Sequence, residues 1–412
     1  MIERNLTARL LEALSDTPVV LLTGARQVGK TTLVEHIVGS TVSKEDRVEY
    51  LSLDDPLTLS RAETDPDGLI GSIPGRLIID EVQRVPDLLR AIKRSVDQDR
   101  RAGRFLLTGS ANPFFLPKVS DSLAGRMEIL TLWPLSHGEL IGRKETFIDL
   151  LFSDSLPKDV PVDSNEDGLK SAIERGGYPE PGQREVARRR EQWFESYVTA
   201  LTQRDIRDIA NIERLSDMPK LFAFCASRTA TLVNYAEFTR STGIPQSTMK
   251  RYISLLEATY ILRTIPAWAT NISKRLVRSP KIHLSDTGLA GALIGFDAGA
   301  NNPVLRGRML ETYVVMEIEK MRGWSERSCK LFHFRTHAGQ EVDIVLEDRS
   351  GAVVGIEVKG TQTLQARDFK GLVELQEAAD NFHRGVLLYD GDDVITYNER
   401  IHAVPIRGLW RW

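Results

Sequence analysis

Short apolar runs alternate with amphipathic stretches along the first 145 residues of the chain. The runs are three to six residues long, which is typical of buried strands, and the stretches between them carry apolar residues at helical spacing. The runs lie at 19–22, 48–53, 77–79 and 105–108. This alternation predicts βαβ units, and therefore an α/β domain in which helices flank a parallel sheet.

The pattern changes after this region. Residues 153–168 are polar, acidic and contain proline, as expected of a linker, and residues 169–215 have a helical pattern. Several short helices and a hairpin are expected within 216–290. Mixed α/β structure then returns, with helices predicted at 307–322 and 365–379 and strands near 331–336, 341–347, 353–359 and 384–389. The predicted organisation is a domain at 1–150, a linker and helical segment at 151–215, and domains at 216–300 and 301–412.

Length and composition limit the class of protein. A chain of 412 residues with 42% hydrophobic and 27% charged residues is neither disordered nor fibrous, and it exceeds one ordinary core. No apolar run approaches the roughly 18 residues that cross a bilayer, and no signal-peptide core follows Met1. Cys225 and Cys329 lie too far apart to indicate a disulfide framework or a zinc site. We therefore expect a cytoplasmic protein without a membrane partner.

The overall net charge of −3 conceals a basic middle segment. Residues 215–300 contain ten Lys and Arg against five Asp and Glu, a local net charge of +5. If the protein binds a polyanion such as DNA, this segment is where we expect it to bind.

A glycine-rich loop follows the first apolar run. Residues 19–23 lead into Gly24, Ala25, Arg26, Gln27, Val28, Gly29, Lys30 and Thr31, and then into Thr32 and an amphipathic helix to residue 38. This is the phosphate-loop pattern G-x-x-x-x-G-K-[ST], whose backbone N–H groups surround phosphate oxygens at a helix N-terminus. Lys30 is predicted to reach the β- and γ-phosphates and Thr31 to bind Mg²⁺. ATP and Mg²⁺ are the predicted cofactors.

Two acidic residues follow the apolar run at 77–79. Asp80 is expected at the carboxyl end of a buried strand beside the phosphate loop, where it would hold the Mg²⁺ shell. Glu81 would polarise an attacking water molecule, unless it is only a solvated acid. A second carboxylate beside the metal ligand favours hydrolysis over binding alone.

Three further residues are candidates near the γ-phosphate. Ser110 and Asn112 follow the apolar run at 105–108, where they either sense the γ-phosphate or form an ordinary turn. Arg126 is either a surface residue or an arginine finger, supplied within the chain or by a neighbouring copy.

The ordered motifs GARQVGKTTL, LSLDDP, LIIDEVQ, LLTGSAN, LAGR, LWPLSHGEL and GGYPE extend over much of the chain. Together they closely resemble the AAA-type ATPases that carry a C-terminal domain of unknown function, the AAA_14/DUF4143 group. The resemblance implies the roles given above for Lys30, Thr31, Asp80 and Glu81. It also supports Ser110 as a sensor and Arg126 as a finger. It leaves the oligomeric state open: the protein is a ring, a dimer or a monomer.

Residues 231–264 predict a helix, a turn and a second helix, followed by a hairpin. The second helix would expose Gln246, Thr248, Lys250 and Arg251, and a basic wing would follow with Lys274, Arg275, Arg278 and Lys281. The order resembles a winged helix, whose second helix enters a DNA groove while the wing contacts phosphates. The alternative is a winged helix used for protein packing.

Acidic residues also mark the predicted C-terminal hairpin. Glu357 and Lys359 share a strand face, and Asp343 lies on the neighbouring strand. An acid on the preceding helix, Glu311 or Glu317, would complete the group. Such a group can bind Mg²⁺ and position water for attack on a phosphodiester. The order resembles the PD-(D/E)xK nucleases and implies a small restriction-endonuclease-like domain. An ordinary charged hairpin, or an inactive domain that holds DNA or a protein, is the alternative.

The sequence therefore predicts an Mg²⁺-dependent, P-loop ATPase of AAA type whose later domains engage DNA, with nuclease activity undecided. The alternative is an ATP-dependent regulatory switch whose nuclease-like domain is inactive and serves as a docking platform.

Overall fold

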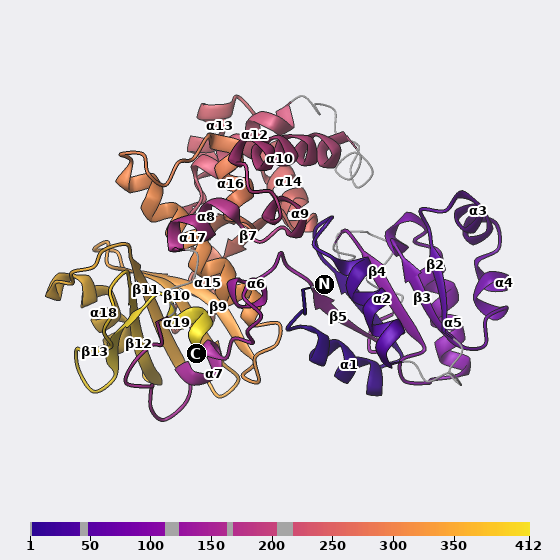
Figure 1. Ribbon diagram of the computed structural model, residues 1–412, viewed down its shortest axis with the longest axis horizontal. Helices are drawn as coiled ribbons and strands as arrows, with labels where there is room; N and C mark the ends of the chain where they lie inside the picture. Colours follow the sequence, from indigo (N-terminus) through magenta and orange to yellow (C-terminus); the bar gives the residue numbers. More distant parts are fainter. Residues whose placement is uncertain (1, 42–47, 112–122, 163–167, 204–216) are drawn as a thin grey trace.

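The structure is a computed structural model that describes residues 2–41, 48–111, 123–162, 168–203 and 217–412, without the side chains of 38–41, 272, 274 and 276. Three units are visible in Figure 1: an N-terminal α/β unit at the right, a helical unit at the top and a C-terminal α/β unit at the lower left.

The N-terminal unit is built on a parallel sheet with the strand order β2-β3-β4-β1-β5. Its strands are β1 (Val19–Thr23), β2 (Val48–Ser52), β3 (Arg76–Asp80), β4 (Phe105–Gly109) and β5 (Met127–Thr131). Four of them match the predicted apolar runs to within one residue at each end. Because β1 lies between β4 and β5, and β4 separates it from β3, the carboxyl ends of β1, β3 and β4 meet at one edge.

Helices cover both faces of this sheet, which explains why its central strands β1, β3 and β4 are apolar and buried along most of their length. Alternate residues of β1 enter different cores: Val20 and Leu22 pack with α1 and α2, and Val19 and Leu21 pack with α3, α4 and α5. These elements are α1 (Thr7–Asp16), α2 (Lys30–Thr41), α3 (Pro56–Thr64), α4 (Pro66–Gly71), the 3₁₀ helix η1 (Val82–Arg84) and α5 (Leu88–Gln98).

The helical unit carries a small antiparallel sheet of order β6-β8-β7. Its strands are β6 (Thr231–Leu232), β7 (Leu262–Ile265) and β8 (Lys281–Leu284). Its helices are α8 (Leu169–Arg175), α9 (Pro179–Gly182), α10 (Ala187–Leu201), α12 (Met218–Ser227), α13 (Tyr235–Thr242), α14 (Gln246–Ala258), α15 (Ile272–Val277) and α16 (Thr287–Ile294). The helix–turn–helix and the hairpin expected from the sequence are both present, as α13–α14 and β7–β8.

The C-terminal unit is a six-stranded mixed sheet of order β13-β14-β12-β11-β10-β9. Its strands are β9 (Cys329–Arg335), β10 (Glu341–Asp348), β11 (Val353–Lys359), β12 (Phe382–Tyr389), β13 (Ile395–Thr396) and β14 (Ile401–Pro405). Its helical elements are α17 (Pro303–Met321), η5 (Ala366–Phe369), α18 (Lys370–Ala378) and α19 (Gly408–Arg411). β9, β10 and β11 are antiparallel, whereas β12 lies parallel to both β11 and β14.

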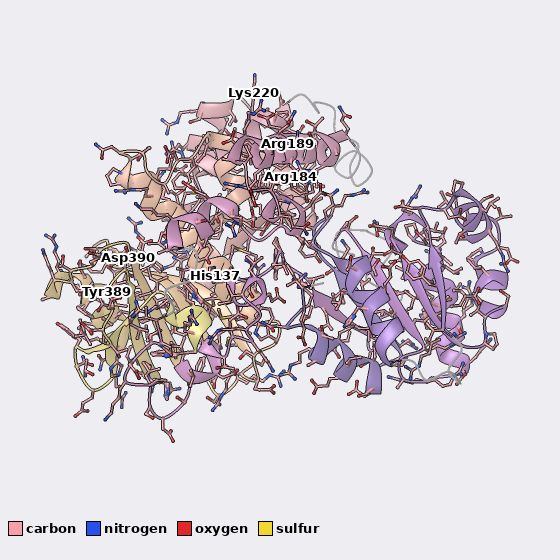
Figure 2. All side chains as sticks on the ribbon, in the orientation of Figure 1. His137, Arg184, Arg189, Lys220, Tyr389 and Asp390 are labelled. Atoms are coloured by element: carbon pink, nitrogen blue, oxygen red, sulfur yellow. The ribbon has the colours of Figure 1, made fainter. Side chains whose placement is uncertain are left out.

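The segment after β5 packs on the C-terminal unit. It contains α6 (His137–Leu140) and α7 (Phe147–Leu151). The Arg384 guanidinium donates to the carbonyl oxygens of Leu150 and Leu151, each at 2.9 Å. The ring of His137, labelled in Figure 2, lies against that of Trp410 of α19, with centroids 4.2 Å apart and planes tilted by 38°. The segment that follows β5 thereby connects the N-terminal α/β unit to the C-terminal unit through direct contacts.

Among the described residues, no helix combines the length and apolar character needed to cross a membrane.

Candidate active site and a second carboxylate cluster

The loop between β1 and α2 adopts a backbone that requires glycine. Gly24 has a φ of +148°, and a Cβ added there would lie 2.1 Å from the carbonyl oxygen of Leu132. Gly29 has a φ of +95°. Lys30 begins α2, is 5% exposed, and donates from Nζ to the carbonyl oxygens of Gly24 and Ala25, both at 2.9 Å. Its ammonium therefore lies over the loop that is predicted to hold phosphates.

Other parts of the chain fix the remainder of the loop. The Arg4 guanidinium donates to the carbonyl oxygen of Val28 at 2.7 Å, and the Tyr197 hydroxyl of α10 donates to that of Arg26 at 3.3 Å. Ala25 and Val28 are buried, whereas Gln27 is exposed and has a φ of 61°. The loop is thus clamped from the N-terminal segment and from the helical unit.

Asp80 ends β3 beside the start of α2. Its carboxylate lies 3.2 Å from the Thr31 hydroxyl and accepts a hydrogen bond of 3.0 Å from the Tyr50 hydroxyl. A further hydrogen bond comes from Thr108 of β4. Burial, and then the charge of Asp80, raise the pKa of Tyr50. A buried carboxylate beside a hydroxyl supplies the oxygen ligands that Mg²⁺ prefers, so the residues present fit that ion.

Glu81 lies at the same edge of the sheet in an unusual backbone conformation. It has φ 59° and ψ 44°, the left-handed region that non-glycine residues rarely adopt. Its carboxylate accepts hydrogen bonds from the Ser110 hydroxyl at 3.1 Å and from Gln83. The Gln83 amide also donates to the Ser110 oxygen at 2.9 Å. Three polar side chains from two strand ends therefore hold one another beside Asp80.

Arg126 lies at the opposite edge of the sheet. It immediately precedes β5, and its carbonyl oxygen accepts from Val19 at the start of β1. The phosphate loop follows the other end of β1, about 16 Å away at ~3.3 Å per residue. The Arg126 guanidinium instead forms an ion pair with Asp97, with 2.6 Å between Nε and Oδ1. In this structure Arg126 therefore lies far from the phosphate loop of its own chain, because β5 is parallel to β1. Asn112, the other candidate, lies outside the described residues.

A cavity of about 560 Å³ adjoins the loop. Its wall includes Gly29, Thr32 and His36 from the loop and α2. Ile2 from the N-terminal segment and Pro179 from α9 close other sides. A mainly apolar cavity next to a phosphate loop is suited to the base of a nucleotide.

The four residues predicted for the second site also come together, at the C-terminal sheet. Ile344 pairs with Ile356 in antiparallel register, which brings Asp343 beside Glu357, and a bulge in β10 follows Val342. Asp343 accepts a 3.0 Å hydrogen bond from the backbone of Val358. Glu357 pairs with Lys359 at 2.6 Å.

A fifth residue changes the chemistry of this cluster. Lys281 of β8 extends from the helical unit, and its Nζ lies 2.7 Å from Glu311 and 3.2 Å from Asp343, with Glu341 also in contact. Burial opposes its charge, but the three carboxylates hold its pKa well above the usual value. Among the described residues, no group of three or more acidic, His or Cys side chains is arranged to hold a metal ion. The Mg²⁺ site expected here is therefore not formed in this arrangement, because an ammonium lies among its carboxylates.

The predicted basic wing is likewise engaged inside the protein. Arg275 donates to Glu347 of β10 at 3.1 and 2.7 Å and lies over the ring of Phe332, 4.9 Å from its centroid. Arg278 donates to the carbonyl oxygen of Arg335 at 3.3 Å, and Lys281 is 2% exposed. Arg275 and Lys281 therefore do not form the exposed phosphate-binding wing expected from the sequence. The side chain of Lys274 lies outside the described residues.

Sequence reasoning gave no role to Gln83, Tyr50, Thr108 or Arg4. Gln83 belongs to the motif LIIDEVQ, two residues after Glu81, so its spacing was a usable signal. No comparable local signal existed for Arg4 or Lys281, since their partners lie far away in the sequence.

Three family models match the chain in succession. An AAA domain model matches residues 16–141, the domain of unknown function DUF8612 matches 166–300, and the domain of unknown function DUF4143 matches 306–409. The matched regions follow the three units of the fold.

Two mycobacterial proteins are similar over almost the whole chain. The uncharacterized proteins Mb2031c of Mycobacterium bovis and Rv2008c of Mycobacterium tuberculosis are each 31% identical over 412 residues, covering 98% of this chain and 83% of each relative.

Solved structures show weaker similarity. A Walker-type ATPase of Pyrococcus abyssi is 14% identical, with 71% of this chain and 96% of that chain covered and a TM-score of 0.41. AMPPCP-bound DnaA of Aquifex aeolicus is 15% identical, with 61% and 85% covered and a TM-score of 0.32. The similarity to the mycobacterial proteins, by contrast, covers 98% of this chain at 31% identity. The chain therefore belongs to the family of these two mycobacterial proteins, and its N-terminal unit is an AAA-type P-loop ATPase domain.

Proposed function

We propose that the protein is an Mg²⁺-dependent ATPase in which nucleotide binding and hydrolysis at the β1–α2 loop act as a switch on the helical unit. The observation that carries this proposal is the convergence of Lys30, Thr31, Asp80, Glu81 and Ser110 at one edge of a parallel sheet. Phosphate-loop enzymes need these groups together, because charge on the transferred phosphoryl group must be neutralised while water is oriented.

Binding would begin with a change of partner for Lys30. Its ammonium now donates to two neutral carbonyl oxygens, at 2.9 Å each, and a phosphate oxygen is a stronger acceptor than a carbonyl. Thr31 and Asp80 would hold Mg²⁺, which neutralises charge on the phosphate oxygens. Gly29 and Thr32 would meet the nucleotide on the side of the 560 Å³ cavity, where the base would lie.

Hydrolysis would depend on Glu81. Its carboxylate would accept a hydrogen bond from the attacking water and orient the water toward the γ-phosphate. Ser110 and Gln83 donate to that carboxylate and so fix its direction. Arg126 could contribute only to the site of a neighbouring copy, since it lies at the far edge of its own sheet.

The switch would act through residues that join the loop to the helical unit. Tyr260 follows α14, and its hydroxyl donates to the hydroxyl of Thr23 at 2.6 Å. Thr23 is the last residue of β1, directly before the phosphate loop. Tyr197 of α10 contacts the loop at Arg26. A shift of the loop on nucleotide binding would therefore be transmitted to two helices of the neighbouring unit.

The test is the Glu81→Gln variant. Because the amide is a far weaker base, phosphate release should fall at least ~100-fold while ATP affinity, measured by calorimetry, stays within about twofold of the wild-type value. Glu63→Gln, at an exposed position of α3, is the matched control. A wild-type rate in Glu81→Gln would remove Glu81 from catalysis.

For the C-terminal unit we favour a docking role over a nuclease. The ammonium of Lys281 lies among the carboxylates that a nuclease would use for Mg²⁺. The expected result is that the purified protein does not cut single-stranded, duplex or branched DNA with Mg²⁺ present. Cleavage that is lost in Asp343→Ala and Lys359→Ala would restore the nuclease interpretation.

DNA binding through α14 is a second candidate function. The exposed residues Gln246, Lys250 and Arg251 share one side of this helix, whereas Tyr252 and Leu256 face the core. Neutralising Lys250 and Arg251 together should weaken DNA binding and reduce its salt dependence by about two phosphate contacts. Lys330→Ala, at an exposed position of β9, is the control. DNA affinity and salt dependence unchanged in the α14 variant would exclude this helix as the binding surface.

A further inference from the structure

We propose that the ammonium of Lys281 takes the place of a divalent cation among the carboxylates of the C-terminal unit, so that removing it turns this cluster into a divalent-cation site. The native cluster is then a closed site, in which the helical unit supplies the cation.

The environment of the ammonium is that of a hard cation. The nitrogen lies 2.7 Å from an oxygen of Glu311 and 3.2 Å from one of Asp343, and it also contacts Glu341. The Lys281 side chain is 2% exposed. Several carboxylate oxygens around one buried positive charge are also the ligands that Mg²⁺, Mn²⁺ and Ca²⁺ select.

An independent observation indicates that a cation belongs here. Glu357 is 6% exposed, and its Oε1 pairs with Lys359. Its Oε2 is buried without a hydrogen-bond partner in the described part of the chain. Glu357 lines a cavity of about 390 Å³ together with Glu311, Asp343 and Lys281. A buried carboxylate oxygen without a donor is unusual, and a positive charge in the cavity would satisfy it.

The lysine reaches this position because the helical unit is fixed against the C-terminal unit. Lys281 begins β8, which pairs with both β6 and β7. Two residues later His283 contacts Thr312 of α17 at 3.2 Å, and Trp268 donates from its indole to Glu347 at 2.6 Å. Ammonium and divalent cation would occupy the same space, so the cluster can hold only one of them. Separation of the two units would be needed to open it.

The experiment compares Mn²⁺ binding to nucleotide-free, full-length variants by calorimetry. Lys281→Met keeps most of the aliphatic stem and removes the charge. Lys281→Met/Glu341→Gln is charge-balanced, because it removes one positive and one negative charge. Glu341 is chosen because it is the most exposed of the three carboxylates that contact Lys281, and its removal leaves Glu311, Asp343 and Glu357 as ligands. Lys281→Arg retains the positive charge. Adding Asp343→Asn to the charge-balanced variant removes a ligand and corrects for Mn²⁺ bound at the nucleotide site.

The charge-balanced variant should bind one more Mn²⁺ per chain than the wild type, and millimolar Mn²⁺ should raise its unfolding temperature relative to EDTA. Lys281→Arg and the Asp343→Asn variant should show neither effect. If the Lys281→Met variant folds only in the presence of Mn²⁺, that result would also support the proposal. The proposal would be overturned if the charge-balanced variant folds but binds no additional Mn²⁺. It would also be overturned if the additional Mn²⁺ binds equally well with and without the Asp343 carboxylate. Loss of folding in that variant that Mn²⁺ does not reverse would overturn it too. None of these outcomes depends on ATP hydrolysis, so they leave the proposed ATPase function to its own test.

Discussion

Two clusters in this protein place a lysine near acidic residues, and they differ in what the lysine contacts. At the N-terminal site, Lys30 donates to the carbonyl oxygens of its own loop, and Asp80 is hydrogen-bonded by neutral hydroxyl groups. At the C-terminal cluster, Lys281 forms ion pairs with Glu311 and Asp343. The first lysine is near neutral acceptors that a phosphate can replace, whereas the second is neutralised by buried carboxylates.

The comparison shows that residue types and spacing do not decide whether a site can accept a ligand. Both clusters carry the acids and the lysine that their motifs predict. At the C-terminal cluster, a residue from another unit supplies the charge that a metal ion would bring. A buried charge without its partner costs several kcal/mol, so the two lysines should respond differently to removal.

The largest expected effect is on stability. Lys281→Met should lower the free energy of unfolding by about 3–5 kcal/mol, because it leaves buried carboxylates without a counter-ion. Lys30→Met should lower it less, by about 1–3 kcal/mol, since two hydrogen bonds to carbonyl oxygens are lost. Urea denaturation of the two variants measures both values. Equal losses would erase the distinction between the clusters.

Glu145 extends the comparison to a buried carboxylate held by neutral donors. Its oxygens accept from the backbone of Gly138 at 2.8 Å and from Asn5 at 2.6 Å. Burial, followed by the charge of Glu317, raises its pKa to about 8. Because the folded state keeps a proton that the unfolded chain releases near pH 4.3, this contribution to stability is complete at low pH and is lost as pH rises toward 8.

Urea denaturation between pH 5 and 8 tests this expectation. Stability of the wild type should fall with pH by about 1 kcal/mol per unit more than that of Glu145→Gln. Glu12→Gln, at a position on α1 facing solvent, is the matched control. Parallel pH profiles for the wild type and Glu145→Gln would contradict the raised pKa.

The smallest expected effect concerns Gln83, which holds both Glu81 and Ser110. Gln83→Ala should reduce ATP turnover about tenfold, or ~1.4 kcal/mol, because the Glu81 carboxylate is no longer fixed. ATP affinity should be unchanged, which calorimetry can verify. A loss of affinity without a change in turnover would instead place Gln83 in the binding of nucleotide.

Local sequence patterns predicted much of the fold. The strands at 19–23 and 353–359 follow from apolar runs, and the phosphate loop follows from glycines at positions whose φ angles are positive. Asp80 was correctly expected at the end of β3, since parallel strands deliver their following residues to one edge of the sheet.

The remaining features depend on contacts between distant parts of the chain. The position of Arg126 follows from the parallel pairing of β5 with β1, which no local pattern reveals. Lys281 was expected in an exposed wing because its neighbours are basic, yet it meets Glu311 and Asp343 from another unit. The acids Glu311, Asp343 and Glu357 were correctly expected to lie together, but the sequence did not indicate which cation they hold.

The central claim is that the loop around Lys30 binds a nucleotide triphosphate. Calorimetric titration of the wild type, Lys30→Ala and the exposed control Lys330→Ala with ATP and Mg²⁺ tests it most directly. The wild type and the control should bind one ATP per chain, and Lys30→Ala should lose at least ~100-fold in affinity, as expected when charge-assisted hydrogen bonds to phosphate are removed. Equal affinity in all three proteins would contradict the account.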